Sequence, residues 1–72
     1  MTRHQQPRTG DTVMINAGVT CGGVDVGEVR LVVSQAYTEP DGRPWLWGVD
    51  AEQHRYRLPC ATVTVSEPRR TY

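Results

Sequence analysis

The sequence has no Phe and no Lys, and only two of its 72 residues are Cys. Without Phe, the large side chains of a hydrophobic core have to come from Trp and Tyr. We therefore expect four aromatic residues to supply most of the bulky packing: Trp45, Trp47, Tyr37 and Tyr56. All the basic residues are Arg, and we derive no function from that choice.

The two cysteines, Cys21 and Cys60, form no CxxC pair. Their number and spacing exclude a disulfide framework and a cysteine zinc site. His4 and His54 could complete a four-ligand metal site with the two thiols, but His4 lies in a polar end of the chain, so we expect no metal and no cofactor. Both thiols are expected to be small buried side chains. A Cys21–Cys60 bridge stays open as an alternative for an exported protein.

Long apolar runs and catalytic motifs are also missing. No stretch approaches the ~20 apolar residues of a membrane span, and no signal-peptide pattern opens the chain. We expect a cytoplasmic protein without membrane contact. The sequence has no GxxxxGK[ST] phosphate loop. A lone His54 near Asp50 and Glu52, without a nucleophile beside it, is a weak indication of acid–base catalysis, and we expect no enzyme.

The residues that are present favour short strands joined by tight turns. Gly and Pro together account for twelve residues, and Val is the commonest apolar residue; both features favour strands and turns over helices. A chain of this length forms one domain. We place that domain at residues 10–67, between a disordered basic N-terminal end at 1–9 and a basic C-terminal end at 68–72.

Apolar and polar residues alternate with the period of a strand in five stretches. The expected strands are residues 12–16, 28–36, 45–49, 54–58 and 62–66. Glu39-Pro40-Asp41-Gly42 predicts a tight hairpin turn, and Pro59-Cys60-Ala61 predicts a single helical turn. A Gly-rich loop at 17–27 follows the first strand. This order predicts an all-β fold, a five-stranded SH3-like small barrel, whose closure would leave no strand edge unpaired.

Several of these segments resemble a known family. Gly10-Asp11-x-Val13-x-Ile15, followed by Gly27-Glu28-Val29, resembles the opening of KOW and other SH3-like barrels. The resemblance extends to small uncharacterised SH3-like proteins of high-GC bacteria through Asp41-Gly42-Arg43-Pro44-Trp45 and Leu58-Pro59. It covers residues 10–66 and implies a fold rather than a function, because that family brings no assigned activity.

A second relative with an SH3-like barrel is an enzyme, the plasmid-borne type II dihydrofolate reductase. It works as a tetramer around a pore that is lined by a Val-Gln-Ile-Tyr stretch. The comparable strand here reads His54-Arg55-Tyr56-Arg57 and does not match. The basic residue that contacts the cofactor phosphates in that enzyme has no clear counterpart either. An oligomeric pore enzyme is therefore only a distant alternative.

Two Trp and two Arg provide the candidate binding site. Trp45 and Trp47 share a face of one expected strand, and Arg55 and Arg57 share a face of the next. Aromatic side chains on one face line the peptide groove of SH3 modules, and Arg side chains hold carboxylates or phosphates. With Tyr37, these residues predict a non-enzymatic binding module for a protein or peptide partner. A homodimer through an exposed strand edge is a further option.

Each of these residues also has a purely structural interpretation. The Trp rings could fill the core, and the Arg side chains could pair across strands with nearby acids. The acids considered for that pairing are Glu28, Asp50 and Glu52.

The charges are unevenly distributed although the chain as a whole is neutral. The two ends carry a charge of +4 and the body between them −4. Basic ends can contact nucleic acid phosphates, which gives the alternative function, a KOW-like nucleic-acid-binding protein. The residues that would make those contacts are Arg3, Arg8, Arg69 and Arg70. The acidic body argues against a nucleic acid groove on the barrel itself.

Overall fold

The computed structural model describes residues 6–67, and these residues form an all-β fold. The all-β part of the predicted fold is therefore confirmed. The strands are β1 (Thr12–Ile15), β2 (Thr20–Cys21), β3 (Val24–Asp25), β4 (Arg30–Thr38), β5 (Pro44–Val49), β6 (Arg55–Pro59) and β7 (Val63–Glu67). One 3-10 turn, η1 (Cys60–Thr62), joins β6 to β7. None of the described residues forms a helix with the length and apolar character that a membrane crossing requires.

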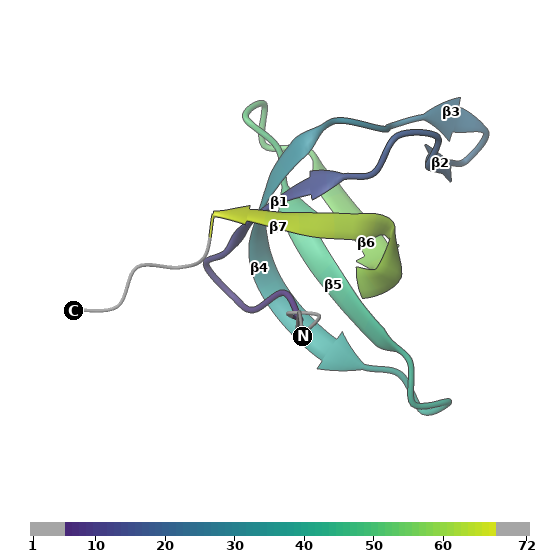
Figure 1. Cartoon of the computed structure of the whole chain (residues 1–72), viewed down its shortest axis with the longest axis vertical. Coiled ribbons are helices and arrows are strands. Elements are labelled where there is room, and N and C mark those ends of the chain that lie inside the picture. Colours follow the sequence, from purple (N-terminus) through teal and green to yellow (C-terminus); the bar gives the residue numbers. More distant parts are fainter. Residues whose placement is uncertain (1–5, 68–72) are drawn as a thin grey trace, which may run out of the picture.

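Five strands form one antiparallel sheet in the order β6-β5-β4-β1-β7, and β2 pairs with β3 in a separate small hairpin. In Figure 1, β1 and β7 run across the direction of β4, β5 and β6. Since β4 pairs with both β1 and β5, it connects the two halves of a strongly bent sheet. The hydrogen bonding leaves the sheet open, with β6 and β7 as its edges.

The core lies on the concave face of this sheet and is aliphatic. Alternation in β1 and β4 buries Val13, Ile15, Leu31 and Val33, as the pattern predicts. The remaining members of the core are Leu46, Leu58, Cys60 and Val63. The expectation that Trp and Tyr supply most of the bulky packing is wrong, because no Trp belongs to the core and only Tyr56 packs partly against it.

Strand β5 shows why the indoles lie outside. Trp45, Trp47 and Val49 share a face as predicted, but Leu46 and Gly48 are the buried residues of this strand. A Cβ placed on Gly48 would lie only 3.0 Å from the Cβ of Leu31. The side chain of Leu31 therefore fills the space beside Gly48, and the buried face of β5 carries a glycine and an aliphatic side chain instead of the indoles.

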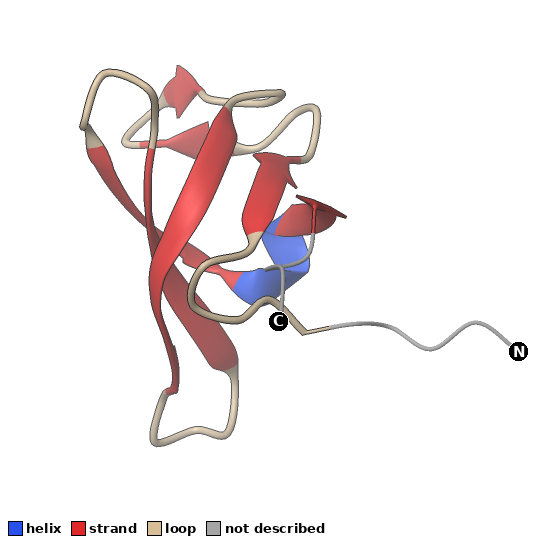
Figure 2. Ribbon diagram, turned by 90° about the vertical axis from the view of Figure 1, so that its left-hand side faces the viewer, coloured by secondary structure: helices blue, strands red, loops and turns tan. Residues whose placement is uncertain are grey.

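The predicted turn at residues 39–42 is confirmed and sets the register of the β4–β5 hairpin. Gly42 has a φ of +88°, a conformation that glycine adopts at low cost. Its N–H donates to the carbonyl oxygen of Glu39 at 2.8 Å. Figure 2 shows this turn at the lower tip of the long hairpin and η1 as a single helical turn. The resulting register places Tyr37 opposite Trp45 and Gln35 opposite Trp47.

The segment before β1 is attached to the sheet. Pro7 is buried, the N–H of Gly10 donates to the carbonyl oxygen of Val33 at 2.8 Å, and the N–H of Arg8 donates to the carboxylate of Asp11 at 2.8 Å. The Asp11 residue is only 3% exposed. Among the four residues proposed for nucleic acid contacts, Arg8 is exposed on this segment. The other three lie outside the described residues: Arg3, Arg69 and Arg70.

Both cysteines are free thiols. Cys60 is buried in η1, and desolvation raises the pKa of its thiol. Cys21 is exposed on the β2–β3 hairpin. The prediction of a buried thiol is therefore correct for Cys60 and wrong for Cys21, whose strand is too short to have a covered face.

Candidate functional site

The convex face of β4, β5 and β6 brings together the five residues that the sequence proposed as a binding site. Residues directly opposite each other on antiparallel strands point to the same side of a sheet. The register pairs Tyr37 with Trp45, and it pairs Trp47 with Arg57 and Val49 with Arg55. All five side chains therefore share one face, but they fall into two groups with different surroundings.

The first group is a closed cluster centred on Arg57, which we call the Arg57 stack: Tyr37, Glu39, Trp45 and Arg57. The guanidinium carbon of Arg57 lies 4.5 Å from the centroid of the Trp45 ring, a cation–π geometry. Its Nε donates to the hydroxyl oxygen of Tyr37 at 2.6 Å, and its Nη2 pairs with the carboxylate of Glu39. The Tyr37 hydrogen bond is the first cause that raises the pKa of Arg57.

Glu39 was not among the candidate site residues. The acids considered as partners for the Arg pair were Glu28, Asp50 and Glu52, but Arg57 pairs with Glu39 across the hairpin. The sequence does indicate that Glu39 lies close to the neighbouring strands, because Glu39 begins the turn that folds β4 against β5. The consequence is that the charge of Arg57 is matched within the protein and one face of Trp45 is covered.

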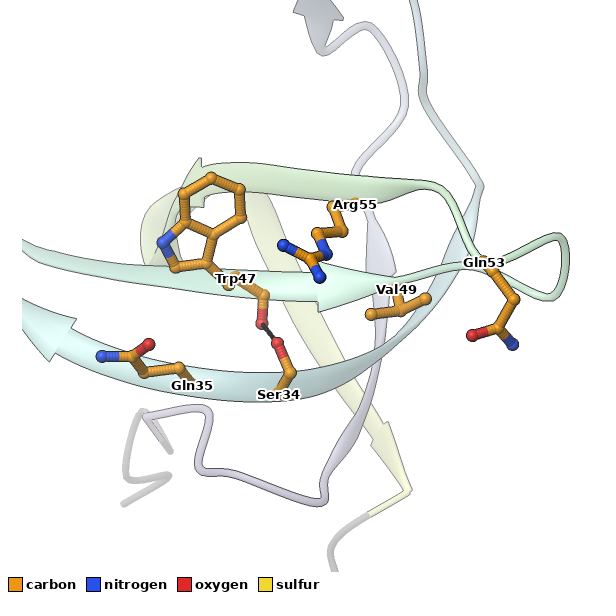
Figure 3. Close-up of a pocket in the computed structure, with 6 residues that line it drawn as sticks. All are labelled: Ser34, Gln35, Trp47, Val49, Gln53 and Arg55. Atoms are coloured by element: carbon orange, nitrogen blue, oxygen red, sulfur yellow. Dashed lines mark hydrogen bonds between the residues drawn. The ribbon is translucent and has the colours of Figure 1, made fainter.

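The second group lines an open hollow, which we call the Trp47 groove. Trp47 is 36% exposed. The hollow has a volume of about 640 Å³ and is lined by Ser34, Gln35, Trp47, Val49, Gln53 and Arg55. Figure 3 shows the guanidinium of Arg55 between Trp47 and Val49, with Gln35 toward one end and Gln53 toward the other.

A β-bulge in β4 shapes the wall of this groove. The register between β4 and β5 shifts between Val33 and Gln35, so Ser34 has no direct partner on β5. Its hydroxyl donates instead to the carbonyl oxygen of Trp47 at 3.3 Å. Bulges bend the strand and redirect side chains. Sequence alternation could not reveal this feature, because Ser34 fits a regular strand equally well.

Arg55 differs from Arg57 in its electrostatic surroundings. Within residues 6–67, the side chain of Arg55 takes part in no ion pair and no hydrogen bond. None of the six residues that line the Trp47 groove is acidic. The groove therefore combines an exposed indole, two amides and one cation that is free to pair with a ligand.

Asp50 does not pair with Arg55 because its carboxylate is engaged in the turn between β5 and β6. One carboxylate oxygen of Asp50 accepts the N–H groups of Glu52 and His54, each at 2.9 Å. The other accepts the hydroxyl of Tyr56 at 3.2 Å and lies 3.4 Å from Nδ1 of His54. The His54 N–H is the first cause that lowers the pKa of Asp50. These bonds hold the turn between β5 and β6.

The same turn brings together three side chains of the types that bind metals. One ligand atom from each of Asp50, Glu52 and His54 lies within 4.8 Å of the others. The bonds of Asp50 account for this proximity as turn geometry, so we assign no metal to it.

Comparison of the chain with known protein families, with characterised proteins and with solved structures finds no match. The resemblance to SH3-like barrels therefore stays a prediction from the sequence. The function has to be argued from the groove itself, since a fold does not imply one.

Proposed function

We propose that this protein is a non-enzymatic binding module that holds a peptide segment of a protein partner in the Trp47 groove. The observation that carries the proposal is the division of the five candidate residues. Tyr37, Trp45 and Arg57 satisfy one another and Glu39, whereas Trp47 and Arg55 face an open hollow. A ligand gains most from side chains that have no partner in the free protein.

The composition of the groove fits a peptide. An exposed Trp offers a large rigid surface for an apolar side chain or a proline ring. Gln35 and Gln53 carry amides that can both donate and accept hydrogen bonds, as a peptide backbone requires. The only hydroxyl among the lining residues, that of Ser34, donates to a main-chain carbonyl, and no His lines the hollow, so the groove offers no activated nucleophile.

We also propose that the bent sheet is an SH3-like barrel that is open between β6 and β7. Two features support this assignment. The sheet order β6-β5-β4-β1-β7 places β1 beside β7, which are the first and the last strand of this sheet in chain order. A single 3-10 turn connects the last two strands, as the sequence pattern predicts.

A nucleic acid ligand has less support on the described residues. Phosphate-driven binding requires several Lys or Arg along the path of the strand. The Trp47 groove has one, and Arg57 beside it is already paired with Glu39.

Selection from a random peptide library displayed on phage tests the proposed function. Enriched peptides are titrated into the ¹⁵N-labelled protein, and the amide and indole resonances that move are mapped onto the structure. We expect the largest changes at Trp47, Gln35 and Gln53. Peptides whose effects cluster on β2 and β3 or on β7, or a library that yields no binder, would contradict the proposal.

A further inference from the structure

The Trp47 groove does not end at Val49. A second hollow of about 440 Å³ shares Val49 and Gln53 with it and reaches Val32, Thr12, Arg30 and Glu67. The sheet register explains this continuity, because Arg55 is opposite Val49, Val49 is opposite Val32, and Val32 is opposite Thr12. The two hollows form one path across β6, β5, β4 and β1 on the convex face.

The middle of this path is apolar. Val32 is 51% exposed, and its cross-strand partner Val49 is half-buried. Two adjacent aliphatic side chains on a sheet face offer a site for an aliphatic residue of a ligand, since burying apolar surface is favourable.

The charges along the path are asymmetric. At the Trp47 end the only charged lining residue is Arg55, whose side chain has no partner within residues 6–67. The second hollow has three charged lining residues, Arg30, Asp50 and Glu67, and two of them are acidic. The carboxylate of Asp50 is occupied by the bonds of its turn. A negative charge on a ligand is therefore favoured beside Arg55 and disfavoured near Glu67.

We infer that the natural occupant is an extended acidic peptide segment, with a proline against Trp47, a Glu or Asp side chain paired with Arg55, and an aliphatic residue on Val32 and Val49. This inference rests on the proposed function and specifies its ligand. A carboxylate matches the planar guanidinium in a bidentate pair. Because the path continues beyond Arg55 in both directions, the carboxylate is that of a side chain within a passing segment rather than of a chain terminus.

A single-stranded nucleic acid fits this path less well. Its phosphates recur at every nucleotide, so a strand long enough to cover the path would bring negative charge to Glu67 as well as to Arg55. A peptide with one acid places its charge beside Arg55 and away from Glu67.

Blocked pentapeptides test this inference on the full chain. The probes are acetyl-Pro-Pro-Glu-Val-Leu-amide, its Gln counterpart, and the Gln peptide with a free terminal carboxylate, each titrated by ¹⁵N–¹H NMR. On the wild-type protein we expect the Glu peptide to bind about fivefold more tightly than either Gln peptide. In Arg55→Gln the Glu and Gln peptides should bind equally. The matched control Arg43→Gln, which removes an Arg that is paired with Asp41 outside the groove, should keep the fivefold preference.

Four outcomes would overturn the inference. They are equal binding of the Glu and Gln peptides to the wild-type protein, equal loss of preference in Arg43→Gln, tighter binding of the peptide with the free terminus, and no shift of the groove resonances at millimolar peptide. Oligothymidylate that moves the same resonances, with an affinity that falls steeply with salt, would show that the ligand of this path is a single-stranded nucleic acid and not a peptide. Equal binding of the Glu and Gln peptides at the groove contradicts the acidic ligand but leaves the proposed function intact. Library-selected peptides that map elsewhere contradict both the acidic ligand and the proposed function.

Discussion

Replacing Leu46 with Ala is expected to lower the free energy of unfolding by about 2–5 kcal/mol. Leu46 is fully buried at the centre of β5, opposite Leu58 on one side and Ala36 on the other. Natural domains are stable by roughly 0.05–0.15 kcal/mol per residue, which is about 4–11 kcal/mol for a chain of 72 residues. Urea titration followed by circular dichroism should therefore find the unfolding midpoint of Leu46→Ala at a clearly lower urea concentration than that of the wild type.

Val32→Ala is the matched control for this prediction. Val32 is also an aliphatic strand residue, but it is 51% exposed on the convex face. Its replacement should change the free energy of unfolding by about 0.5 kcal/mol or less. If Val32→Ala destabilises the protein as much as Leu46→Ala, the two faces of the sheet have been assigned the wrong way round.

Replacing Trp47 with Ala is expected to weaken the binding of library-selected peptides by about 30-fold or more, the effect of a central interface residue worth about 2 kcal/mol. The indole is the largest apolar surface in the groove, and Arg55 and the Gln amides surround it. The variant should remain folded because Trp47 lies outside the core. Titration calorimetry measures the affinity, and the dispersion of the amide resonances reports the fold.

Tyr37→Phe provides the control on the same face. It keeps an aromatic ring but removes the hydroxyl that accepts the hydrogen bond from Arg57, and it does not touch the Trp47 groove. The affinity for the same peptides should stay within about twofold of wild type. Equal weakening in both variants would mean that the Arg57 stack, and not the groove, contacts the ligand.

Much of the fold could be predicted from residue patterns. Period-two alternation correctly assigned the buried faces of β1 and β4, where the half-buried Met14 separates Val13 from Ile15 and exposed residues flank Leu31 and Val33. The turn at residues 39–42 followed from Pro and Gly at positions where they have distinct backbone preferences. These features are local, so the sequence contains the information that determines them.

The buried face of β5 could not be predicted in the same way. Both faces of this strand are apolar, with Trp45 and Trp47 on one and Leu46 on the other. Composition favoured the larger side chains for the core, but the buried face of β5 carries Leu46 and Gly48, and Leu31 fills the space beside Gly48. This contact joins residues that are distant in the chain, and alternation within one strand says nothing about it.

The candidate site shows the same limit. Alternation indicated that Trp45 and Trp47 share a face of one strand and that Arg55 and Arg57 share a face of the next strand. It could not distinguish Arg57 from Arg55, because the difference depends on Glu39, which the β4–β5 hairpin brings to Arg57. The bulge at Ser34, which opens the groove beside Trp47, also depends on pairing between strands.

Acrylamide quenching of two single-Trp variants shows whether Trp47 is the open aromatic residue and Trp45 the covered one. Trp45→Phe leaves Trp47 as the only fluorophore, and Trp47→Phe leaves Trp45. We expect the emission of Trp47 to be red-shifted and strongly quenched, and that of Trp45 to be better protected because Arg57 lies over its ring. A protected, blue-shifted Trp47 beside a freely quenched Trp45 would contradict the assignment of the groove and the functional proposals that rest on it.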